Sequence, residues 1–215
     1  MARNYISKLP LKSTQEKPVW VEQLTSSNYI DWWHQNIQPS ISTQTERADH
    51  DWNWKRLYFM RRAYPQKDPQ YFALCTQGIN GTVVLSLCLC LCDERFPVGD
   101  QEKALFVWYL SGAPKEALTP FIEEKQLPGL IGRGSLDTTL VKSLKKGHNG
   151  CVWLHADGRG GKKLINTYIS WGMKQIPSEV KILRFGADRN DGRYLYFDQT
   201  QSEVALTTFD IYRES

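Results

Sequence analysis

Residues 129–135, with the sequence GLIGRGS, have the composition and spacing of an anion-binding loop. An apolar run at 105–110 precedes them, and a pattern with helical spacing at 136–146 follows directly. Glycines let backbone N–H groups approach an anion closely, and the N-terminus of a helix adds a partial positive charge. The run therefore predicts a phosphate-binding loop, although alone it is equally consistent with a flexible entrance to a helix. It matches neither the GxGxxG nor the Gly-Lys-Ser/Thr phosphate-binding motif.

A histidine and a tyrosine that could move protons follow this run. Residues 151–155 have the pattern of a short buried strand, with His155 at its end. The next stretch, at 164–171, has apolar residues at helical spacing, contains Tyr168 and ends at Gly172. Both residues also have a plain structural interpretation, as a satisfied histidine and a core aromatic.

The elements that would position these residues alternate between strands and helices. Residues 71–75 and 82–92 predict a hairpin around a turn at 78–81, and residues 194–197 predict a late strand. A helix at 136–146 between strands at 105–111 and 151–155 completes the pattern. The sequence therefore predicts an α/β fold.

This order of elements resembles the core of the GCN5-related N-acetyltransferase (GNAT) superfamily. That family has a strand, an xGxGx loop, a helix, a second strand and a helix ending in Tyr-x-x-x-Gly-hydrophobic. The matching pieces here are 105–111, 131–135, 136–146, 151–155 and 168–173. The chain departs from the family pattern at Gly129, where Gln or Arg is usual, and in the long connection at 113–128.

The resemblance implies a mixed, mostly antiparallel central sheet flanked by helices, with an N-terminal helical extension. Residues 1–69 are expected to form this helical part on the acceptor side, and residues 70–215 the acyl-CoA-binding core. The two parts are expected to pack as one compact domain.

The resemblance also implies an N-acyltransferase that moves an acyl group, most simply acetyl, from acyl-CoA to a primary amine by direct attack. Tyr168 occupies the position of the family's general acid, which protonates the leaving thiolate. The strand and the glycine-rich run are expected to contact the pantetheine arm and the pyrophosphate of the donor, through Val107, Tyr109, Leu110, Ser111, Ile131, Gly132, Arg133, Gly134 and Ser135.

A base must also take a proton from the amine, because an alkyl ammonium has a reference pKa near 10.4. Strand carboxylates often serve in the resembled family, but residues 105–111 contain none. His155 is our candidate, acting directly or through water. His34 or Glu116 on the acceptor side could serve instead.

The cysteines and a short acidic motif do not predict a metal site. Cys88, Cys90 and Cys92 alternate with leucines, which places the thiols on one face of a strand about 6.6–7 Å apart. This spacing favours buried, reduced thiols over a disulfide or a zinc site. The triplet at 49–51, Asp-His-Asp, is interpreted as a solvated turn, because adjacent loop residues seldom converge on one ion.

The first seventy residues are rich in tryptophan, and helices are predicted at 21–35 and 51–62. Their aromatic residues either line an acceptor or acyl pocket or form core beneath surface helices. The basic run at 159–163 could touch the 3′-phosphate of the donor, but a solvated start of a helix fits it better. Residues 189–193 predict a tight turn between the last strands.

Composition narrows the remaining classes of function. The chain of 215 residues has 27 Lys and Arg against 23 Asp and Glu, a mild net charge of +4 that does not indicate nucleic-acid binding. No apolar run reaches the length of a membrane span, and no signal-peptide block is present, so we expect a cytoplasmic protein.

Two alternatives to acetyl transfer remain open from the sequence. A longer acyl chain could come from CoA or an acyl carrier protein and be placed on a peptide or metabolite amine. A non-catalytic module that binds CoA thioesters or a protein partner is the other. The sequence specifies neither the acceptor nor the oligomeric state.

Overall fold

The computed structural model describes residues 3–11, 15–63, 68–184, 187–188 and 190–214. A sheet of eight strands, in the order β1-β2-β3-β4-β5-β6-β10-β7, forms its centre. Adjacent strands pair antiparallel except β5 and β6, which are parallel. The strands are β1 (Lys8–Pro10), β2 (Glu16–Gln23), β3 (Pro69–Gly78), β4 (Gly81–Arg95), β5 (Lys103–Gly112), β6 (Val152–His155), β7 (Lys174–Gln175) and β10 (Tyr194–Phe197). The mixed, mostly antiparallel sheet predicted from the sequence is confirmed.

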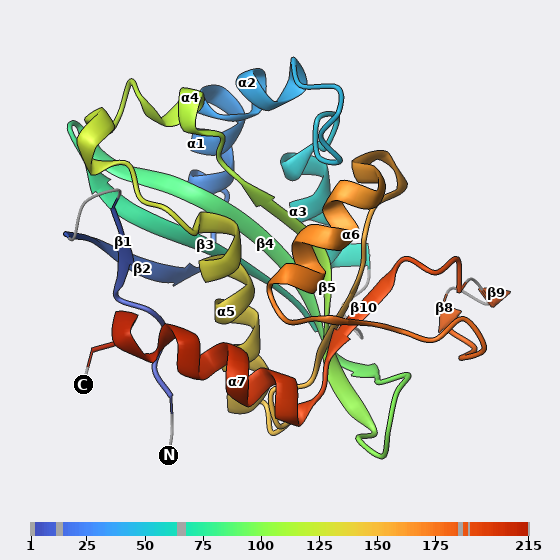
Figure 1. Cartoon of the computed structure of the whole chain (residues 1–215). Helices are drawn as coiled ribbons and strands as arrows, with labels where there is room; N and C mark the ends of the chain where they lie inside the picture. Colours follow the sequence, from blue (N-terminus) through green and yellow to red (C-terminus); the bar gives the residue numbers. More distant parts are fainter. Residues whose placement is uncertain (1–2, 12–14, 64–67, 185–186, 189, 215) are drawn as a thin grey trace.

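Helices cover both faces of this sheet (Figure 1). They are α1 (Asn28–Asn36), α2 (Gln38–Ser42), α3 (Trp54–Ala63), α4 (Lys115–Leu118), α5 (Ile131–Lys145), α6 (Gly161–Ser170) and α7 (Gln199–Phe209). A separate two-stranded sheet, β8 (Leu183–Arg184) and β9 (Ala187–Asp188), projects to one side (Figure 1).

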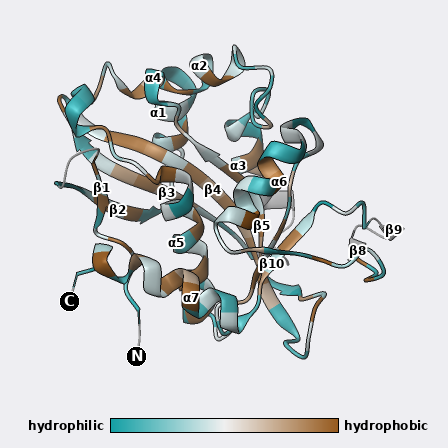
Figure 2. Ribbon diagram, in the orientation of Figure 1, coloured by the Kyte–Doolittle hydropathy of each residue, from teal (hydrophilic) through white to brown (hydrophobic). Residues whose placement is uncertain are grey.

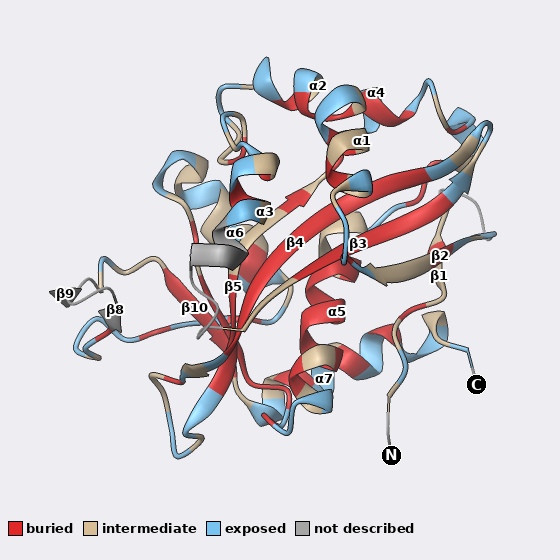
Figure 3. Ribbon diagram, turned by 180° about the vertical axis from the view of Figure 1, so that it is seen from behind, coloured by how far each residue is buried: buried red, intermediate tan, exposed pale blue. Residues whose placement is uncertain are grey.

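The two faces of β4 show how the sequence builds two cores. Side chains alternate along a strand, so Leu85, Leu87 and Leu89 point to one face and pack with α1, α2 and α3. Cys88, Cys90 and Cys92 point to the other face and pack with α5, α6 and α7. Apolar residues run along β3 and β4 (Figure 2), and these strands are buried over most of their length (Figure 3).

All five cysteines are free and buried, as the alternation predicts. Burial raises the pKa of the Cys151 thiol to about 11 and that of Cys75 to about 12. These thiols therefore stay protonated and behave as small apolar groups. Among the residues that the structure describes, no group of His, Cys, Asp or Glu has the arrangement of a metal site.

A bulge in β5 separates this strand from β6. Leu89 of β4 pairs with Tyr109 and Cys90 pairs with Val107, so Trp108 is the extra residue. β6 pairs with β5 only as far as Val107. A bulge bends its strand and increases the local twist. The two parallel strands therefore diverge beyond Val107, and a gap opens between them.

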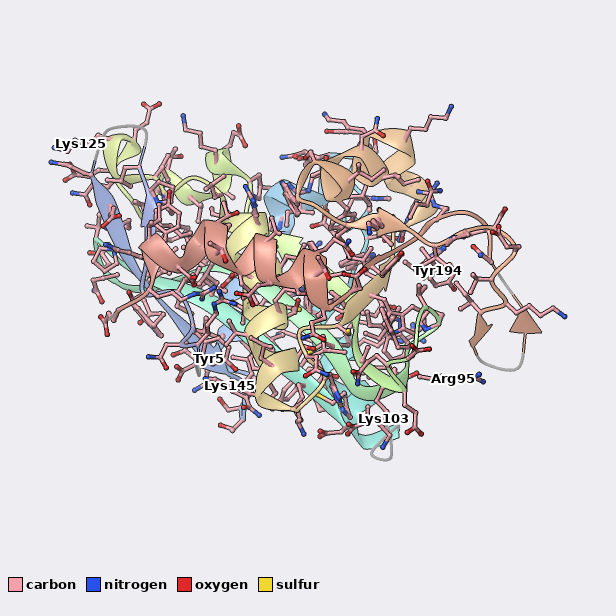
Figure 4. All side chains as sticks on the ribbon, turned by 60° about the horizontal axis from the view of Figure 1, so that its bottom comes forward. Tyr5, Arg95, Lys103, Lys125, Lys145 and Tyr194 are labelled. Carbon is pink, nitrogen blue, oxygen red and sulfur yellow. The ribbon has the colours of Figure 1, made fainter. Side chains whose placement is uncertain are left out.

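The two ends of the chain meet beside α5 and α7 (Figure 1). Arg213 donates two hydrogen bonds to Asp137 of α5, at 2.6 and 2.9 Å, and both side chains are buried. Lys145 places its Nζ 3.9 Å from the ring centroid of Tyr5 (Figure 4). Both contacts fix the terminal segments against the central helix.

Several boundaries differ from those predicted. Residues 21–23, assigned to a helix from the sequence, continue β2, and the helix begins only at Asn28. β1 and β2 join the sheet, so the N-terminal part is not purely helical. Helix α7 was not predicted from the sequence, although its start has a capping box between Asp198 and Gln201.

Candidate functional site

A cavity of about 320 Å³ lies where β5 and β6 diverge. The exposed part of β5, the end of β6, the loop at 43–53 and α6 form its walls. The lining residues are Ala48, Trp52, Phe106, Val107, Trp108, Tyr109, Leu110, Leu154, His155, Asp157, Gly158, Leu164 and Tyr168. Five of the residues predicted from the sequence are thus brought together: Val107, Tyr109, Leu110, His155 and Tyr168.

A wider groove of about 610 Å³ adjoins the cavity, because Ala48 and Leu164 line both. One wall is the loop at 43–53, and the other is the start of α6 with residues 159–160 before it. Lys162 and Lys163 on this wall are exposed. The basic run interpreted from the sequence as a solvated start of a helix therefore lines a groove that leads to the cavity.

Tyr168 lies on α6 and reaches the cavity from the face of the sheet that carries Cys88. Burial raises the pKa of its phenol well above the usual value, and the negative charge of Asp49 acts in the same direction. Within the described residues, no hydrogen bond occupies the hydroxyl. Its ring packs edge-on against Trp171, with centroids 5.5 Å apart. A protonated phenol at the cavity wall can donate a proton to a group bound there.

His155 enters the cavity from the opposite face of the sheet. Leu154 packs in the core beneath α5 and α6, so the next side chain along β6 points the other way, toward the side of α1, α2 and α3. The imidazole lies 4.5 Å from the ring centroid of Tyr194, which is labelled in Figure 4. Its Nε2 atom lies 2.9 and 3.1 Å from the two carboxylate oxygens of Asp191. The histidine is thus oriented by a carboxylate at the edge of the gap.

Two buried polar contacts hold the loop at 43–53 against the end of β5. The Ser111 hydroxyl donates a hydrogen bond to the carboxylate of Asp49, which is 5% exposed. Arg47 donates two hydrogen bonds to that carboxylate, at 2.7 and 2.8 Å, and a third to the Gly112 carbonyl at 2.8 Å. The interpretation of Asp49 as part of a solvated turn is therefore wrong. From the sequence, Ser111 was expected to contact the donor. In the structure its side chain bonds to Asp49 and so anchors the loop.

An ion pair joins the loop at 43–53 to the segment before α6, and both of these segments line the cavity. Arg159 pairs with Asp51 of the loop at 43–53, and with Asp157 at 2.7 Å. Hydrogen bonds from Arg159 are the main cause that lowers the pKa of both carboxyl groups. We call this contact, made by Asp51, Arg159 and Asp157, the clasp. Spacing in the sequence gave no signal for it, because Asp51 and Arg159 are 108 positions apart.

The glycine-rich run at 131–135 is not a loop before the helix: α5 begins at Ile131 and includes it. Gly134 and Ser135 are buried. The Gly134 N–H bonds to the Leu130 carbonyl at 2.8 Å, and the Ser135 hydroxyl makes a hydrogen bond with Ser86. In an α-helix the first N–H groups have no partner within the helix. An anion could therefore use the N–H groups of Ile131, Gly132 and Arg133, whereas Gly134 faces the side chains of Ile6 and Leu9.

The other candidates lie outside the cavity. His34 on α1 and Glu116 on α4 are both exposed, and neither lines it. Of the N-terminal tryptophans, Trp33 and Trp54 are core residues, whereas Trp52 lines the cavity and packs 4.8 Å from Tyr109. In the predicted turn at 189–193, residue 189 lies outside the described residues.

Comparison with known proteins supports the fold. No protein-family model and no curated protein matches the sequence. A mutant of the toxin AtaT, bound to the C-terminus of the antitoxin AtaR, matches with 14% identity over 88% of this chain and 98% of its own, at a TM-score of 0.50. A chimera of the spermidine N-acetyltransferase SpeG from Vibrio cholerae and hSSAT matches with 12% identity over 86% and 98%, also at 0.50.

A GNAT-family acetyltransferase from Staphylococcus aureus Mu50 is also similar, with 12% identity over 84% of this chain and 99% of its own, at a TM-score of 0.49. The two likenesses at 0.50 show that the chain has the fold predicted from its sequence, that of the GCN5-related N-acetyltransferase superfamily. Within the described part of the chain, no helix has the length and apolar character needed to cross a membrane.

Proposed function

We propose that this protein is an N-acyltransferase that moves an acyl group, most simply acetyl, from acyl-CoA to a primary amine. One observation carries the proposal. At the gap between β5 and β6, a protonated phenol and a carboxylate-bound imidazole line one cavity from opposite faces of the sheet.

Direct transfer requires two proton movements in different places. The amine nitrogen attacks the thioester carbonyl carbon, the C–S bond breaks, and the sulfur leaves as a thiolate. The amine must lose a proton, since at neutral pH only about one alkyl amine in a few thousand is unprotonated. The thiolate must gain one. A base and an acid on opposite sides of the acyl group meet both needs without a covalent enzyme intermediate.

Tyr168 is the proposed acid and His155 the proposed base. Burial keeps the Tyr168 phenol protonated at neutral pH, so its proton is available to the sulfur as the C–S bond breaks. The imidazole of His155 accepts the proton of the amine, directly or through water. General acid–base catalysis of this kind typically contributes about 10²–10⁴ in rate.

The surroundings of the cavity suit a phosphorylated donor. We place the pantetheine arm along Val107, Tyr109 and Leu110, where the pairing of β5 with β6 ends and β5 lines the cavity. The first N–H groups of α5 and the exposed Lys162 and Lys163 offer positive charge for the phosphates. The Ser111 hydroxyl bonds to Asp49 and is not assigned to the donor. Ser111 therefore supports the site by holding the loop at 43–53.

The acceptor is proposed to enter from the face that carries His155 and α1–α3. The spermidine N-acetyltransferase named above indicates that this fold can serve amine acetylation. At 12% identity, its substrate is not assigned to this chain. A small-molecule or peptide amine is therefore the class we propose. Trp52, Trp108 and Tyr109 form an aromatic wall of the cavity, so the length of acyl group that it accepts is to be measured.

Thermal stability measured with CoA, acetyl-CoA and longer acyl-CoAs tests donor binding. A ligand at a hundred times its Kd adds about 2.7 kcal/mol, or roughly 5–10 °C for a chain of this size. Stabilisation by acetyl-CoA supports the proposal, and stabilisation that grows with chain length indicates a longer acyl group. If no CoA species stabilises the protein, the proposed donor is wrong.

Turnover of the preferred donor with a panel of amines then tests catalysis. Tyr168→Phe should lower kcat by about 10²–10⁴ and leave donor affinity unchanged. Tyr196→Phe is the matched control, because Tyr196 is a buried tyrosine of β10 that does not line the cavity. Equal loss in the two variants, or no loss in Tyr168→Phe, would contradict the role of the phenol. Donor binding without turnover on any amine would favour a CoA-binding module.

A further inference from the structure

We infer that Asp191 is a positioning residue that fixes the tautomer and orientation of His155 for proton abstraction. The inference rests on the proposed function and adds to it a residue that the sequence did not identify. Asp191 lies 36 positions from His155, in the short loop before β10. Its carboxylate meets Nε2 with both oxygens, at 2.9 and 3.1 Å.

The carboxylate decides which ring nitrogen can act as the base. A carboxylate only accepts hydrogen bonds, so Nε2 must carry the proton that it donates to Asp191. The neutral imidazole then has its unprotonated nitrogen at Nδ1, which can accept the proton of the amine. When His155 becomes an imidazolium, the negative charge of Asp191 stabilises it.

The loop that carries Asp191 is held on both sides. Asn190 donates two hydrogen bonds, to the carbonyls of Pro177 and Val180, at 2.7 and 2.9 Å. Arg193 donates one to the Ala156 carbonyl, directly after His155, at 2.7 Å. The Asp191 carboxylate also accepts the Arg193 N–H at 3.1 Å. The loop therefore presents the carboxylate in one place before any substrate binds, as preorganised catalysis requires.

Other groups near His155 are charged or aromatic, but they have partners of their own. Asp157 pairs with Arg159, and the Arg193 side chain donates to the backbone of residues 156–157. On the far side of the imidazole lies the ring of Tyr194. Asp191 is thus the carboxylate in direct contact with His155 among the described residues.

The pH–rate profile of Asp191→Asn tests the inference. An amide can donate its own N–H to Nε2 and so favour the other tautomer, which places the proton on the nitrogen that must act as base. We expect kcat to fall at least tenfold, donor KM to stay unchanged, and the shape of the pH–rate profile to change. Asp191→Glu, which keeps the charge, should recover part of the rate. A merely structural role would lower kcat by the same factor at every pH.

NMR of the histidine ring gives a readout that does not depend on turnover. The chain has four histidines, so His155→Gln identifies the signal. Asp191→Asn should move the ring proton of His155 from Nε2 to Nδ1, which the chemical shifts of the ring nitrogens report. Asp93→Asn is the matched control, because Asp93 contacts His148 at 3.1 Å before β6 begins. It should leave the His155 signal and the rate unchanged.

The outcomes separate this inference from the proposed function. If His155→Gln is inactive but Asp191→Asn keeps its rate and the ring tautomer of His155, the positioning role is wrong and the transferase proposal stands. If His155→Gln retains full activity, the base and its positioning residue are both wrong, although Tyr168→Phe still tests the transferase. If the unmodified protein neither binds acyl-CoA nor transfers an acyl group, the proposed function itself fails.

Discussion

The two halves of β5 have similar apolar sequences but opposite environments. Residues 104–107 are between 0 and 3% exposed, and Phe106 and Val107 pair with β4 on one side and β6 on the other. Residues 108–110, beyond the bulge, are only partly buried and line the cavity. The bulge at Trp108 separates a half that pairs with β6 from a half that lies beyond this pairing. A strand can therefore supply core and binding surface in succession without any change in residue type.

The loop at 43–53 contacts β5 beyond the last residue that pairs with β6. Asp49 bonds to Ser111, and Arg47 bonds to the Gly112 carbonyl. These contacts satisfy polar groups at the end of the strand, which would otherwise be costly to leave buried. Between the bulge and this anchor, a short stretch of β5 stays available for a ligand. Substitutions in the first half of β5 should therefore cause large losses of stability. Substitutions in the second half should cause smaller losses and should mainly affect ligand binding.

The largest expected effect follows from shortening a side chain in the closed half. Phe106 is fully buried and lies 4.6 Å from the ring centroid of Trp153. Phe106→Ala should lower the free energy of unfolding by about 3–5 kcal/mol, measured by urea denaturation. Trp108→Ala removes a larger but partly exposed side chain and should cost only about 1–2 kcal/mol, with weaker donor binding. Equal losses in the two variants would contradict the division of β5 at the bulge.

The loop anchor should show an intermediate effect. Asp49→Asn keeps the shape of the side chain but leaves Arg47 without its anionic partner. We expect a loss of about 1–3 kcal/mol in unfolding free energy, together with weaker donor binding. Ser111→Ala removes one hydrogen bond and should cost about 1 kcal/mol. The double variant should lose less than the sum, because the two side chains contact each other. Additive losses would mean that Asp49 and Ser111 act separately.

Alternation and glycine patterns were enough to predict the strands at 71–75, 82–92, 105–111, 151–155 and 194–197. Such patterns are local, and they also placed His155 and Tyr168, the proposed base and acid, on regular elements. The partners of those residues could not be predicted the same way. Asp191 and Asp49 reach the site from loops, and a loop position is decided by contacts distant in sequence.

The glycine-rich run shows how a local pattern can be assigned to the wrong element. Residues 131–135 were assigned to the loop before the helix, but they belong to the start of α5. Glycine is a poor helix former, so GLIGRGS was interpreted as a loop. Tertiary packing reverses this preference, because the absent side chains let α5 approach its neighbours closely. A Cβ atom at Gly132 would lie 2.9 Å from the Trp171 ring, and one at Gly134 would lie 3.0 Å from Ile6. The glycines therefore serve helix packing at least as much as anion binding.

Alanine substitutions at Gly132 and Gly134 test two packing contacts of α5 separately. Gly132 faces Trp171, and Gly134 faces Ile6 and Leu9. Alanine favours a helix by about 1 kcal/mol over glycine. At Gly132 this gain should be more than offset, because the rigid indole of Trp171 must move. At Gly134 the neighbours are the flexible ends of Ile6 and Leu9, so the net change should be near zero. We expect Gly132→Ala to melt below Gly134→Ala and to change tryptophan fluorescence, and the reverse order would exclude close packing at Trp171.

The smallest effect on stability is expected at the clasp, whose side chains are exposed or partly exposed. An exposed ion pair contributes at most about 1 kcal/mol, so Asp51→Asn should melt close to the unmodified protein. Because Asp51 and Arg159 join the two walls of the cavity, their separation should instead change the rate of donor binding a few-fold and weaken its salt dependence. Glu16→Gln, which breaks an exposed pair with Lys8 outside the site, should change neither.

The pH dependence of the clasp has a definite sign. Arg159 lowers the pKa of Asp51 and Asp157 below their usual value near 3.9, so the folded state binds fewer protons than the unfolded state. The stabilising effect is therefore complete above this value and is lost as the pH falls through the lower folded-state pKa. Stopped-flow measurements between pH 5 and 8 should give the same difference in binding rate between Asp51→Asn and the unmodified protein at every pH. A difference that changes across this range would mean that a group other than the clasp controls entry to the cavity.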